Sequence, residues 1–265
     1  CAEPSIEVSK KDPDRVINTN FLGTYNILKK CINDNAKIIF LSSSRVYSIS
    51  ALRKIVKNLN LNKKLKINKK IDENFSTQGV KSLYGLSKLS SEELIKEFNY
   101  VSNIKYIINR LGVITGPWQF GKQDQGFVSM WVGRHMFKRK LSYIGFGGKG
   151  NQVRDIIHIK DVCNIILKQI KLFNKVNNKT FNIGGGLRNA ISLNELTLFC
   201  QELTKTKISF SRKKNTSLYD IPYYVTNNSQ IKKYYKWAPR YSKKDIINDI
   251  FNWIKMNKKL KRFFL

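Results

Sequence analysis

A tyrosine and a lysine four residues apart, Tyr84 and Lys88, have the types and spacing best suited to chemistry in this chain. Residues at this spacing share one helix face, so the ammonium of Lys88 can stabilise a tyrosinate and lower the phenol pKa. Ser43 lies upstream, just after the apolar run at 37–41, and its hydroxyl is suited to hold a substrate alcohol or ketone. The three residues therefore predict a site that takes a proton from a sugar hydroxyl while a nicotinamide accepts the hydride.

A second pair with the same spacing, Tyr25 and Lys29, shows that the motif alone is weak. In a chain so rich in lysine, this spacing also arises by chance. Tyr25 lies within an amphipathic stretch that has no strand-end hydroxyl before it in the sequence. We interpret this second pair as a solvated helix face and Tyr84 as the catalytic tyrosine.

Helical and extended patterns alternate along the chain, which is typical of an α/β fold. The patterns predict helices at 14–34, 82–101, 126–138, 161–172, 192–204, 227–235 and 242–257, and strands at 37–42, 105–110 and 180–183. A long polar loop is predicted over 48–80. Ser43 then follows a strand and Tyr84 opens a helix.

The length and the amino-acid composition indicate which broad class of protein this chain belongs to. A chain of 265 residues with 42% hydrophobic residues can bury a large core in one or two domains. It has no apolar run long enough to span a bilayer and no signal peptide, so no membrane association is expected. Only two histidines occur, and the cysteines are far apart, which predicts no metal site, no disulfide framework and a reducing, cytoplasmic location. The cysteines are Cys1, Cys31, Cys163 and Cys200.

A formal net charge of +31 suggests nucleic-acid binding at first sight. The lysines, however, are spread over nearly every predicted helix, and the densest run, at 58–70, falls in the predicted loop. We therefore expect weak attraction to polyanions and no specific nucleic-acid partner. The charge could also help to gather a diphosphate substrate.

Two glycine-rich segments resemble phosphate-binding turns. Residues 145–150 match the pattern Gly-x-Gly-x-x-Gly, but they lead into the strand-like run at 152–158 and open no helix. A helix N-terminus is what holds the pyrophosphate in a true dinucleotide fingerprint. We interpret this segment as a glycine turn and Gly184–Gly186 as a loop.

Several motifs in order give the chain a family resemblance. They are the segments 1–5, 12–13 with 20–26, 42–47, 84–88, 152–158 and 181–185. In this order they resemble the NAD-dependent epimerase/dehydratase family, the extended short-chain dehydrogenases that act on nucleotide sugars. The resemblance covers essentially the whole chain apart from the basic stretch at 50–70.

The resemblance implies an incomplete Rossmann-type, doubly wound parallel sheet with a smaller α/β substrate-binding domain. Residues 1–112 would form the C-terminal part of the NAD-binding domain. Residues 113–265 would mainly bind the nucleotide sugar, with some segments returning to the Rossmann sheet. Roughly 75–80 family residues, with the Gly-rich NAD-binding turn, have no counterpart. We therefore expect a fragment or one half of a split enzyme, of doubtful activity alone.

The segment at 119–126 is the narrowest part of the resemblance, because it is similar to the nucleotide-sugar 2-epimerases of the family. Sugar 4,6-dehydratases carry Asp-Glu where this chain has Ser44 and Arg45, and an arginine cannot replace that base. Arg45 would contact a phosphate or a sugar hydroxyl, or it would pack over the strand end.

The implied mechanism is epimerisation at C2 through a transient keto sugar. Tyr84 removes the proton of the 2-hydroxyl, NAD takes and returns the hydride, Lys88 holds the nicotinamide ribose, and Ser43 binds the reacting oxygen. The implied catalytic residues are Ser43, Tyr84 and Lys88. The implied NAD-binding residues are Ala2, Asn20, Tyr84 and Lys88. The implied substrate-binding residues are Arg45, Gln119, Asp124, Gln125, Arg154 and Asp220.

Structural alternatives stand beside several of these roles. Asn20 would otherwise brace a helix, and Arg154 would otherwise pair with Asp155, although a guanidinium suits the substrate diphosphate. We interpret His158 as structural. Three aromatic residues that could stack on a base are assigned to the core, namely Trp118, Phe120 and Trp131. The resemblance also implies a possible homodimer through the helices that carry residues 20–30 and 84–100.

Three alternative functions remain open at this point. The first is a nucleotide-sugar 4-epimerase or reductase of the same family. The second is an inactive chain that lacks its cofactor half. The third is a polyanion-binding module, for which the charge is the only support.

Overall fold

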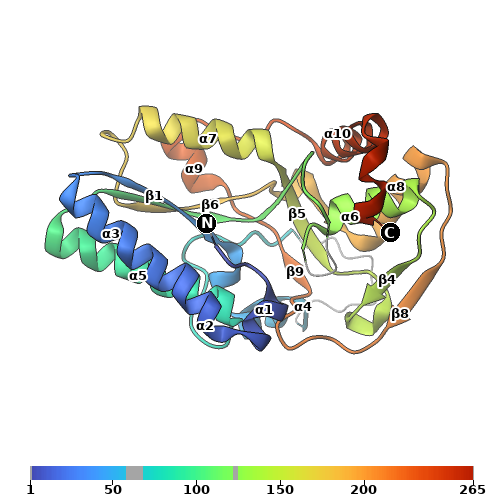
Figure 1. Ribbon diagram of the computed structural model, residues 1–265, viewed down its shortest axis with the longest axis horizontal. Helices are drawn as coiled ribbons and strands as arrows, with labels where there is room; N and C mark the ends of the chain where they lie inside the picture. Colours follow the sequence, from blue (N-terminus) through green and yellow to red (C-terminus); the bar gives the residue numbers. More distant parts are fainter. Residues whose placement is uncertain (1, 58–67, 122–124, 265) are drawn as a thin grey trace.

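The computed structural model describes residues 2–57, 68–121 and 125–264 (Figure 1). Its central feature is a parallel sheet in the order β1 (Ile38–Ser43), β2 (Tyr106–Leu111) and β6 (Lys179–Ile183). The register places Ser43 beside Leu111, and Leu111 in turn beside Ile183. The predicted α/β class is therefore confirmed, with each of these strands within one residue of its predicted bounds.

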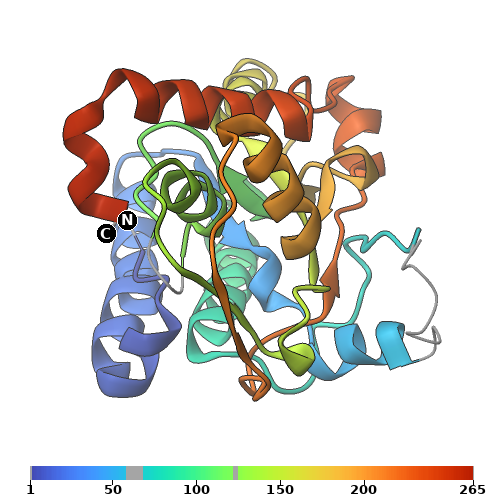
Figure 2. The same cartoon turned by 90° about the vertical axis from the view of Figure 1, so that its right-hand side faces the viewer.

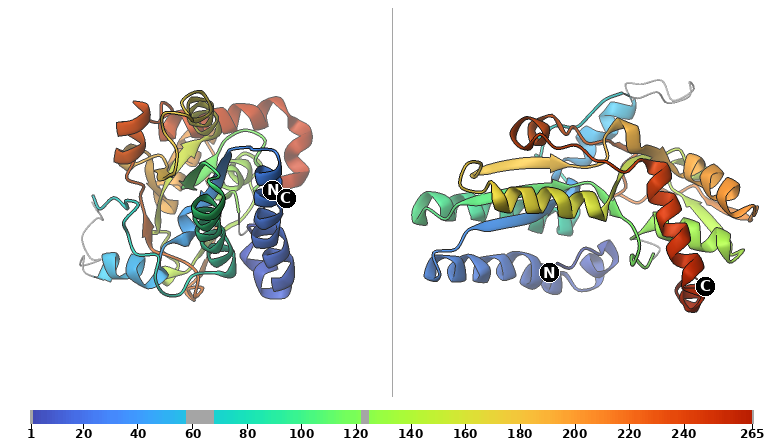
Figure 3. Two further views of the ribbon diagram at one scale, coloured as in Figure 1. Left: turned by 90° about the vertical axis from the view of Figure 1, so that its left-hand side faces the viewer. Right: turned by 90° about the horizontal axis from the view of Figure 1, so that it is seen from above.

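Helices cover both faces of this sheet. α3 (Gly23–Asn33) and α5 (Leu83–Ser102) lie side by side on one face, and α7 (Ile159–Lys171) and α9 (Ser229–Tyr235) lie on the other (Figures 1 and 3). Successive residues of β2 point to opposite faces of the sheet. Ile108 packs against α3 and α5, and Ile107 packs against α7 and α9.

A second group of elements lies beyond the carboxyl end of the sheet (Figure 2). Its strands are β3 (Val113–Thr115), β5 (Val153–His158), β7 (Ala190–Ser192) and β9 (Tyr223–Tyr224), with a separate pair β4 (Leu141–Ile144) and β8 (Phe210–Lys213). Its helices are α6 (Phe127–Met136), α8 (Leu193–Thr204) and α10 (Lys243–Met256). They enclose one apolar core that includes Ile156, Leu196 and Ile250.

Capping residues set the bounds of α5, the helix that carries Tyr84. The hydroxyl of Ser82 accepts the N–H of Gly85 at 3.2 Å and so begins the helix. Asn103 ends it in the left-handed conformation at φ 55°. These local signals explain why the predicted range, 82–101, is close to the observed one.

The helix predicted at 14–34 is divided in the structure. It consists of α2 (Pro13–Val16), a π-helical turn η1 (Ile17–Leu22) and α3. The carbonyl of Asn20, inside that turn, accepts the hydroxyl of Thr24 at 2.6 Å and that of Ser91 at 3.1 Å. Such turns are frequent at functional sites.

The prediction of an uninterrupted polar loop over 48–80 is wrong. Residues Ile49–Lys57 form α4. Ile49, Leu52 and Val56 are buried, and their spacing places them on one helix face. These few apolar residues are separated by polar ones, so the sequence pattern did not indicate a helix. Residues 58–67 of the predicted basic run lie outside the described residues.

Candidate functional site

The predicted catalytic residues meet where β1 ends and α5 begins. Ser43 is the last residue of β1, and Tyr84 lies in the first turn of α5. The Ser43 hydroxyl accepts the backbone N–H of Arg45 at 3.1 Å. It also lies close enough to the Tyr84 phenol to lower the pKa of that group. The two hydroxyls therefore belong to one site.

Burial and charge set the protonation states of Tyr84 and Lys88. Burial raises the pKa of Tyr84 above its ordinary value, while the nearby Ser43 hydroxyl and the Arg45 charge lower it. Lys88 is not among the groups that lower it, so the expectation that Lys88 lowers the phenol pKa is wrong for the ligand-free protein. Burial lowers the pKa of Lys88 to about 8, against the field of the Glu92 carboxylate. The Lys88 ammonium lies 4.2 Å from the centre of the Phe40 ring. The phenol is therefore protonated at neutral pH in the ligand-free protein.

Lys88 is suited to hold a ribose. Its side chain is buried, and the contact that its ammonium makes within the part of the chain that the structure describes is with the Phe40 ring rather than with a hydrogen-bond acceptor. Two vicinal ribose hydroxyls would supply acceptors for this ammonium. The nicotinamide-ribose end of NAD therefore fits this side of the site.

Asn20, another predicted cofactor residue, connects the N-terminal segment to α5 through hydrogen bonds. The amide oxygen of Asn20 accepts the N–H of Glu3 at 2.8 Å. Its amide nitrogen donates to the carbonyl of Glu3 at 3.1 Å and to the hydroxyl of Ser87 at 3.0 Å. Asn20 thereby ties the segment that contains exposed Ala2 to α5. A cofactor role for Ala2 and Asn20 stays a prediction.

Arg154 and Asp220, both predicted to bind substrate, form an ion pair. A terminal nitrogen of Arg154 donates to the Asp220 carboxylate at 3.1 Å and to the carbonyl of Ile221 at 2.6 Å. Burial lowers the pKa of Arg154 to about 10. Asp155, the alternative partner, does not pair with Arg154 in this way, since its carboxylate accepts the N–H of Gly186 at 2.8 Å.

Arg45 lies beside this pair. Its guanidinium donates to the carbonyl of Tyr219 at 3.0 Å. Burial lowers the pKa of Arg45, and the nearby charges of Asp220 and Tyr84 raise it. Arg45 is therefore within electrostatic range of both the phenol and Asp220. Its contact to a phosphate or a sugar hydroxyl stays a prediction.

The segment at 119–126 is only partly described. The amide nitrogen of Gln119 donates to the carbonyl of Ile114 at 3.1 Å, and its amide oxygen is buried without a partner among the described residues. Gln125 is half-buried, and Asp124 lies outside the described residues. Substrate binding by these three residues stays a prediction.

Two of the three aromatic residues assigned to the core are exposed. Trp131 is buried and donates to the Thr197 hydroxyl at 3.0 Å. Trp118 is 69% exposed and Phe120 is 37% exposed, so the prediction is wrong for them. Both rings pack against Trp253, with ring centres 5.7 and 5.8 Å from that of the indole.

The remaining motifs have structural roles. The ring nitrogens of His158 contact the Asp249 carboxylate at 2.9 Å and the N–H of Lys160 at 3.0 Å. The glycine run at 145–150 leads through a short turn into β5, as predicted. A Cβ on Gly184 would lie 2.0 Å from the Thr226 hydroxyl, so close packing explains that glycine.

Sequence reasoning missed two charged residues that support the site. Glu92 is fully buried one turn after Lys88, and its carboxylate pairs with Arg110 at 2.7 Å. Arg53, on α4, donates to the carbonyls of Ser217 at 3.0 Å and Asp220 at 2.9 Å. The four-residue spacing from Lys88 is a signal that could have found Glu92; no local pattern indicates Arg53.

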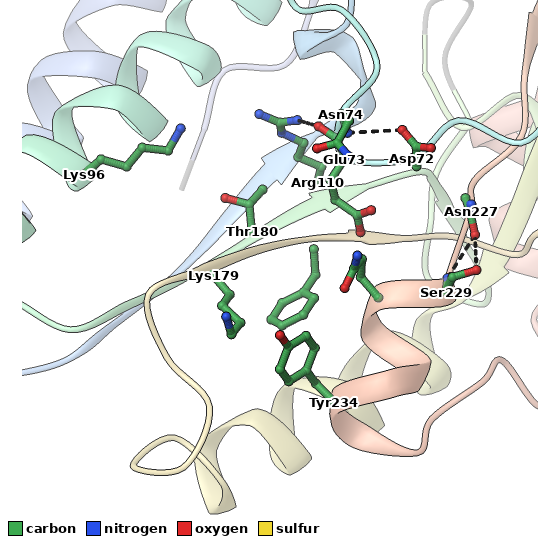
Figure 4. A pocket seen from close by; sticks show the side chains of 12 residues that line it. Asp72, Glu73, Asn74, Lys96, Arg110, Lys179, Thr180, Asn227, Ser229 and Tyr234 are labelled. Atoms are coloured by element: carbon green, nitrogen blue, oxygen red, sulfur yellow. Dashed lines mark hydrogen bonds between the residues drawn. The ribbon is translucent and has the colours of Figure 1, made fainter.

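A cavity of about 440 Å³ lies away from the predicted catalytic residues, between β2, β6, α5 and α9 (Figure 4). Arg110, Lys179 and Tyr234 line it together with Glu73 and Asn227. Ser43, Tyr84 and Lys88 do not line this cavity. In the residues described, no helix is both long and apolar enough to cross a membrane, and no cluster of three potential metal ligands occurs.

The chain is similar in sequence to known proteins. The chain is 26% identical to CDP-paratose 2-epimerase of Salmonella typhi over 96% of its own length and 75% of that protein. It is 29% identical to a putative UDP-glucose 4-epimerase of Methanocaldococcus jannaschii, over 97% of its length and 76% of that protein.

A solved structure extends the comparison to the fold. The UDP-glucose 4-epimerase of Thermus thermophilus, in complex with NAD, superposes with a TM-score of 0.80 at 18% identity, over 97% of this chain and 76% of that one. The profile of the NAD dependent epimerase/dehydratase family matches residues 1–184. With the strand-end serine and the helix-borne tyrosine and lysine, this match shows that the chain belongs to the NAD-dependent epimerase/dehydratase family.

Proposed function

We propose that this chain catalyses NAD-dependent epimerisation of a nucleotide-activated sugar at C2, through a transient keto intermediate. The observation that carries the proposal is that Ser43 ends β1 where Tyr84 begins α5, with buried Lys88 one turn away on the same helix. A phenol beside a serine at a strand end is placed to exchange a proton with a sugar hydroxyl.

Each of the three residues has one role in this proposal. Ser43 holds the reacting sugar oxygen. Tyr84 accepts the hydroxyl proton as the C2–H bond breaks, and it returns that proton when the keto group is reduced from the other face of the sugar. Lys88 stabilises the tyrosinate and holds the ribose. NAD, when bound, supplies the hydride acceptor and donor.

The substrate diphosphate is assigned to Arg154. Its guanidinium is half-buried and pairs with a carboxylate whose side chain is 29% exposed. A diphosphate could replace Asp220 as the anionic partner, because a guanidinium binds two phosphate oxygens in parallel. Gln119, Gln125, Asp124 and Arg45 are proposed as further contacts to the nucleotide sugar.

The alternative is epimerisation at C4. The relative from M. jannaschii is named as a putative UDP-glucose 4-epimerase, and it is slightly more identical to this chain than the 2-epimerase is. The sequence of the segment at 119–126 favours C2. The same Ser43–Tyr84 pair would serve either carbon, so the orientation of the bound sugar decides between them.

We further propose a homodimer formed through α3 and α5. These helices lie side by side, and each exposes apolar side chains, with Ile27 56% exposed and Val101 78% exposed. Sedimentation of the purified chain should give the mass of a dimer, and substitution of Ile27 by Glu should give a monomer. A monomeric wild-type chain would contradict this proposal.

The test of the function is a product assay. The chain is incubated with NAD and with CDP-, UDP- and GDP-sugars, and the sugar stereochemistry is read by NMR. We expect inversion at C2 of one of these donors. Inversion at C4 would establish the C4 alternative. If the chain binds NAD but converts none of these sugars, both the C2 and the C4 proposals are contradicted.

A further inference from the structure

Three exposed aromatic side chains form a patch where the segment 116–121 meets the C-terminal end of the chain. Trp118 and Phe120 both lie against Trp253 of α10. Phe263, on the 3₁₀-helix η5 (Lys258–Phe264), lies against Phe120 with the ring centres 4.5 Å apart. Trp118 is 69% exposed, Phe263 43% and Phe120 37%. We call Trp118, Phe120 and Phe263 the aromatic patch, and contiguous exposed apolar surface of this kind marks a site of interaction.

The backbone at Trp118 is strained. Its φ of 68° is in the left-handed region, which bulky side chains rarely occupy. The backbone is fixed on both sides of it, because the N–H of Gln119 donates to the Gly116 carbonyl at 3.4 Å and a Cβ on Gly121 would lie 2.6 Å from the backbone nitrogen of Met130. Burial of the indole does not explain the strain, since most of that side chain is exposed. Strain of this kind points to a role for the residue at the surface.

Cations surround the aromatic patch. Residues 251–265 contain five lysines and arginines and no aspartate or glutamate. Lys255, Lys259, Lys261 and Arg262 are exposed. The Arg262 guanidinium lies 4.9 Å from the centre of the Phe263 ring, so charge and apolar surface are in direct contact. An anionic partner with an apolar layer would satisfy both features.

The position of the patch suits a broad partner. α10 and η5, drawn in red, form a projecting margin of the molecule (Figures 2 and 3). A planar surface can therefore reach the cations of 255–262 and the aromatic patch together.

We propose that the aromatic patch and the cations of 255–262 bind the surface of an anionic phospholipid bilayer. Aromatic rings favour the headgroup level of a bilayer, and lysine and arginine side chains are attracted to anionic headgroups. The contact is peripheral, because no helix in the described residues is long and apolar enough to cross a membrane. The expectation of no membrane association was based on the lack of a spanning segment, and peripheral binding requires none.

A single-stranded nucleic acid suits the patch less well. Such a ligand stacks successive bases on separate aromatic rings along a groove. Here the rings pack on one another, since Phe120 contacts both Trp253 and Phe263. A cluster of this kind presents one continuous apolar surface, which matches lipid better than a row of bases.

Tryptophan fluorescence gives a direct test, because Trp118 is the exposed one of the four tryptophans. Trp131, Trp237 and Trp253 are only 3%, 3% and 7% exposed. The chain is mixed with vesicles of phosphatidylcholine and phosphatidylglycerol in equal parts, with bromine on the acyl chains, at about 0.1 M salt. We expect co-sedimentation with these vesicles and quenching of the emission by bromine. Trp118→Phe should still co-sediment and should lose most of the quenching.

Affinity for unbrominated vesicles of the same composition measures each part of the surface. Trp118→Ala should weaken binding by about tenfold. Lys259→Gln combined with Arg262→Gln should weaken it by about 30-fold. The matched control is Lys232→Gln with Lys233→Gln, which removes the same charge from α9, away from α10 (Figure 1), and should leave the affinity nearly unchanged.

Several results would overturn the proposal. They are a lack of co-sedimentation with the anionic vesicles, binding without quenching of Trp118, and an equal loss of affinity in the α9 control. Protection of Trp118 from acrylamide by a single-stranded oligonucleotide but not by vesicles would assign the patch to nucleic acid instead. Protection that grows with protein concentration alone would assign it to a second copy of the chain. None of these measurements depends on catalysis, so the proposed function and this inference can fail separately.

Discussion

The site has two sides that are built in different ways. The helix side consists of Tyr84, Lys88 and Glu92, which follow one another at four-residue intervals along α5. The arginine side consists of Arg45, Arg53 and Arg154. Each of these arginines donates a hydrogen bond to the segment 217–221, which is 66 to 174 residues away from it in the sequence. The helix side is encoded by local spacing, whereas only the complete fold assembles the arginine side.

The two sides also differ in their exposure to water. Glu92 and Arg110 form an ion pair with side chains 0% and 7% exposed, but the Asp220 side chain is 29% exposed. Removing the partner of a buried charge costs more free energy of folding than removing the partner of a charge that water can solvate. We therefore expect the helix side to dominate both activity and stability.

The largest effect is expected from Tyr84→Phe, which removes the proton acceptor. Turnover should fall by about 10²–10⁴-fold, the usual contribution of a general base. Tyr25→Phe is the matched control, because Tyr25 has the same spacing to a lysine but its ring carries the Lys29 ammonium at 4.9 Å on α3. Equal turnover rates for Tyr84→Phe and Tyr25→Phe would contradict the assignment of Tyr84, rather than Tyr25, as the catalytic tyrosine.

Glu92→Gln tests the buried ion pair of the helix side. The neutral amide leaves the Arg110 guanidinium without its carboxylate, so the free energy of unfolding in urea should fall by about 3–5 kcal/mol. Asp34→Asn removes an exposed pair with Lys30, in which the side chains are 70% and 45% exposed, and should cost less than about 1 kcal/mol. Similar losses would show that burial does not set the cost of removing the partner of a charged side chain.

The junction between the two sides is tested by Gly85→Ala. The new Cβ would meet the Arg45 carbonyl, so the helix must move, and the expected loss of stability is about 1–3 kcal/mol. Gly23→Ala is the control, because its Cβ would lie 3.6 Å from the Asn18 carbonyl, an ordinary van der Waals distance. That variant should be neutral or slightly stabilising. A neutral Gly85→Ala would mean that the close approach is not needed.

The last effect concerns Lys88 and pH. Its folded pKa of about 8 lies below the ordinary lysine value of 10.5, so the unfolded chain binds more protons between these values. Stability therefore rises with pH across this window and is lost as pH falls towards 8, by about 3 kcal/mol. Lys88→Met should lack this rise when the two unfolding curves are compared. An equal rise in both proteins would assign it to other groups.

The sequence was sufficient where the determinants are local. Ser43, Tyr84 and Lys88 follow from one strand end and one helical spacing, and the Ser82 cap explains the bounds of α5. Local spacing gave no indication that Asp220 is the partner of Arg154, since 66 residues separate them. Helix α4 was missed because its few apolar residues are scattered among polar ones.

The most direct test of the central claim uses a nucleotide sugar that carries deuterium at C2. If Tyr84 accepts the hydroxyl proton while the C2 hydride leaves and returns inside the site, the C2-inverted product keeps its deuterium, and turnover is slower than with the unlabelled sugar. Loss of deuterium to water in the inverted product would contradict the account. Inversion at C4 with no isotope effect from the C2 label would contradict it as well.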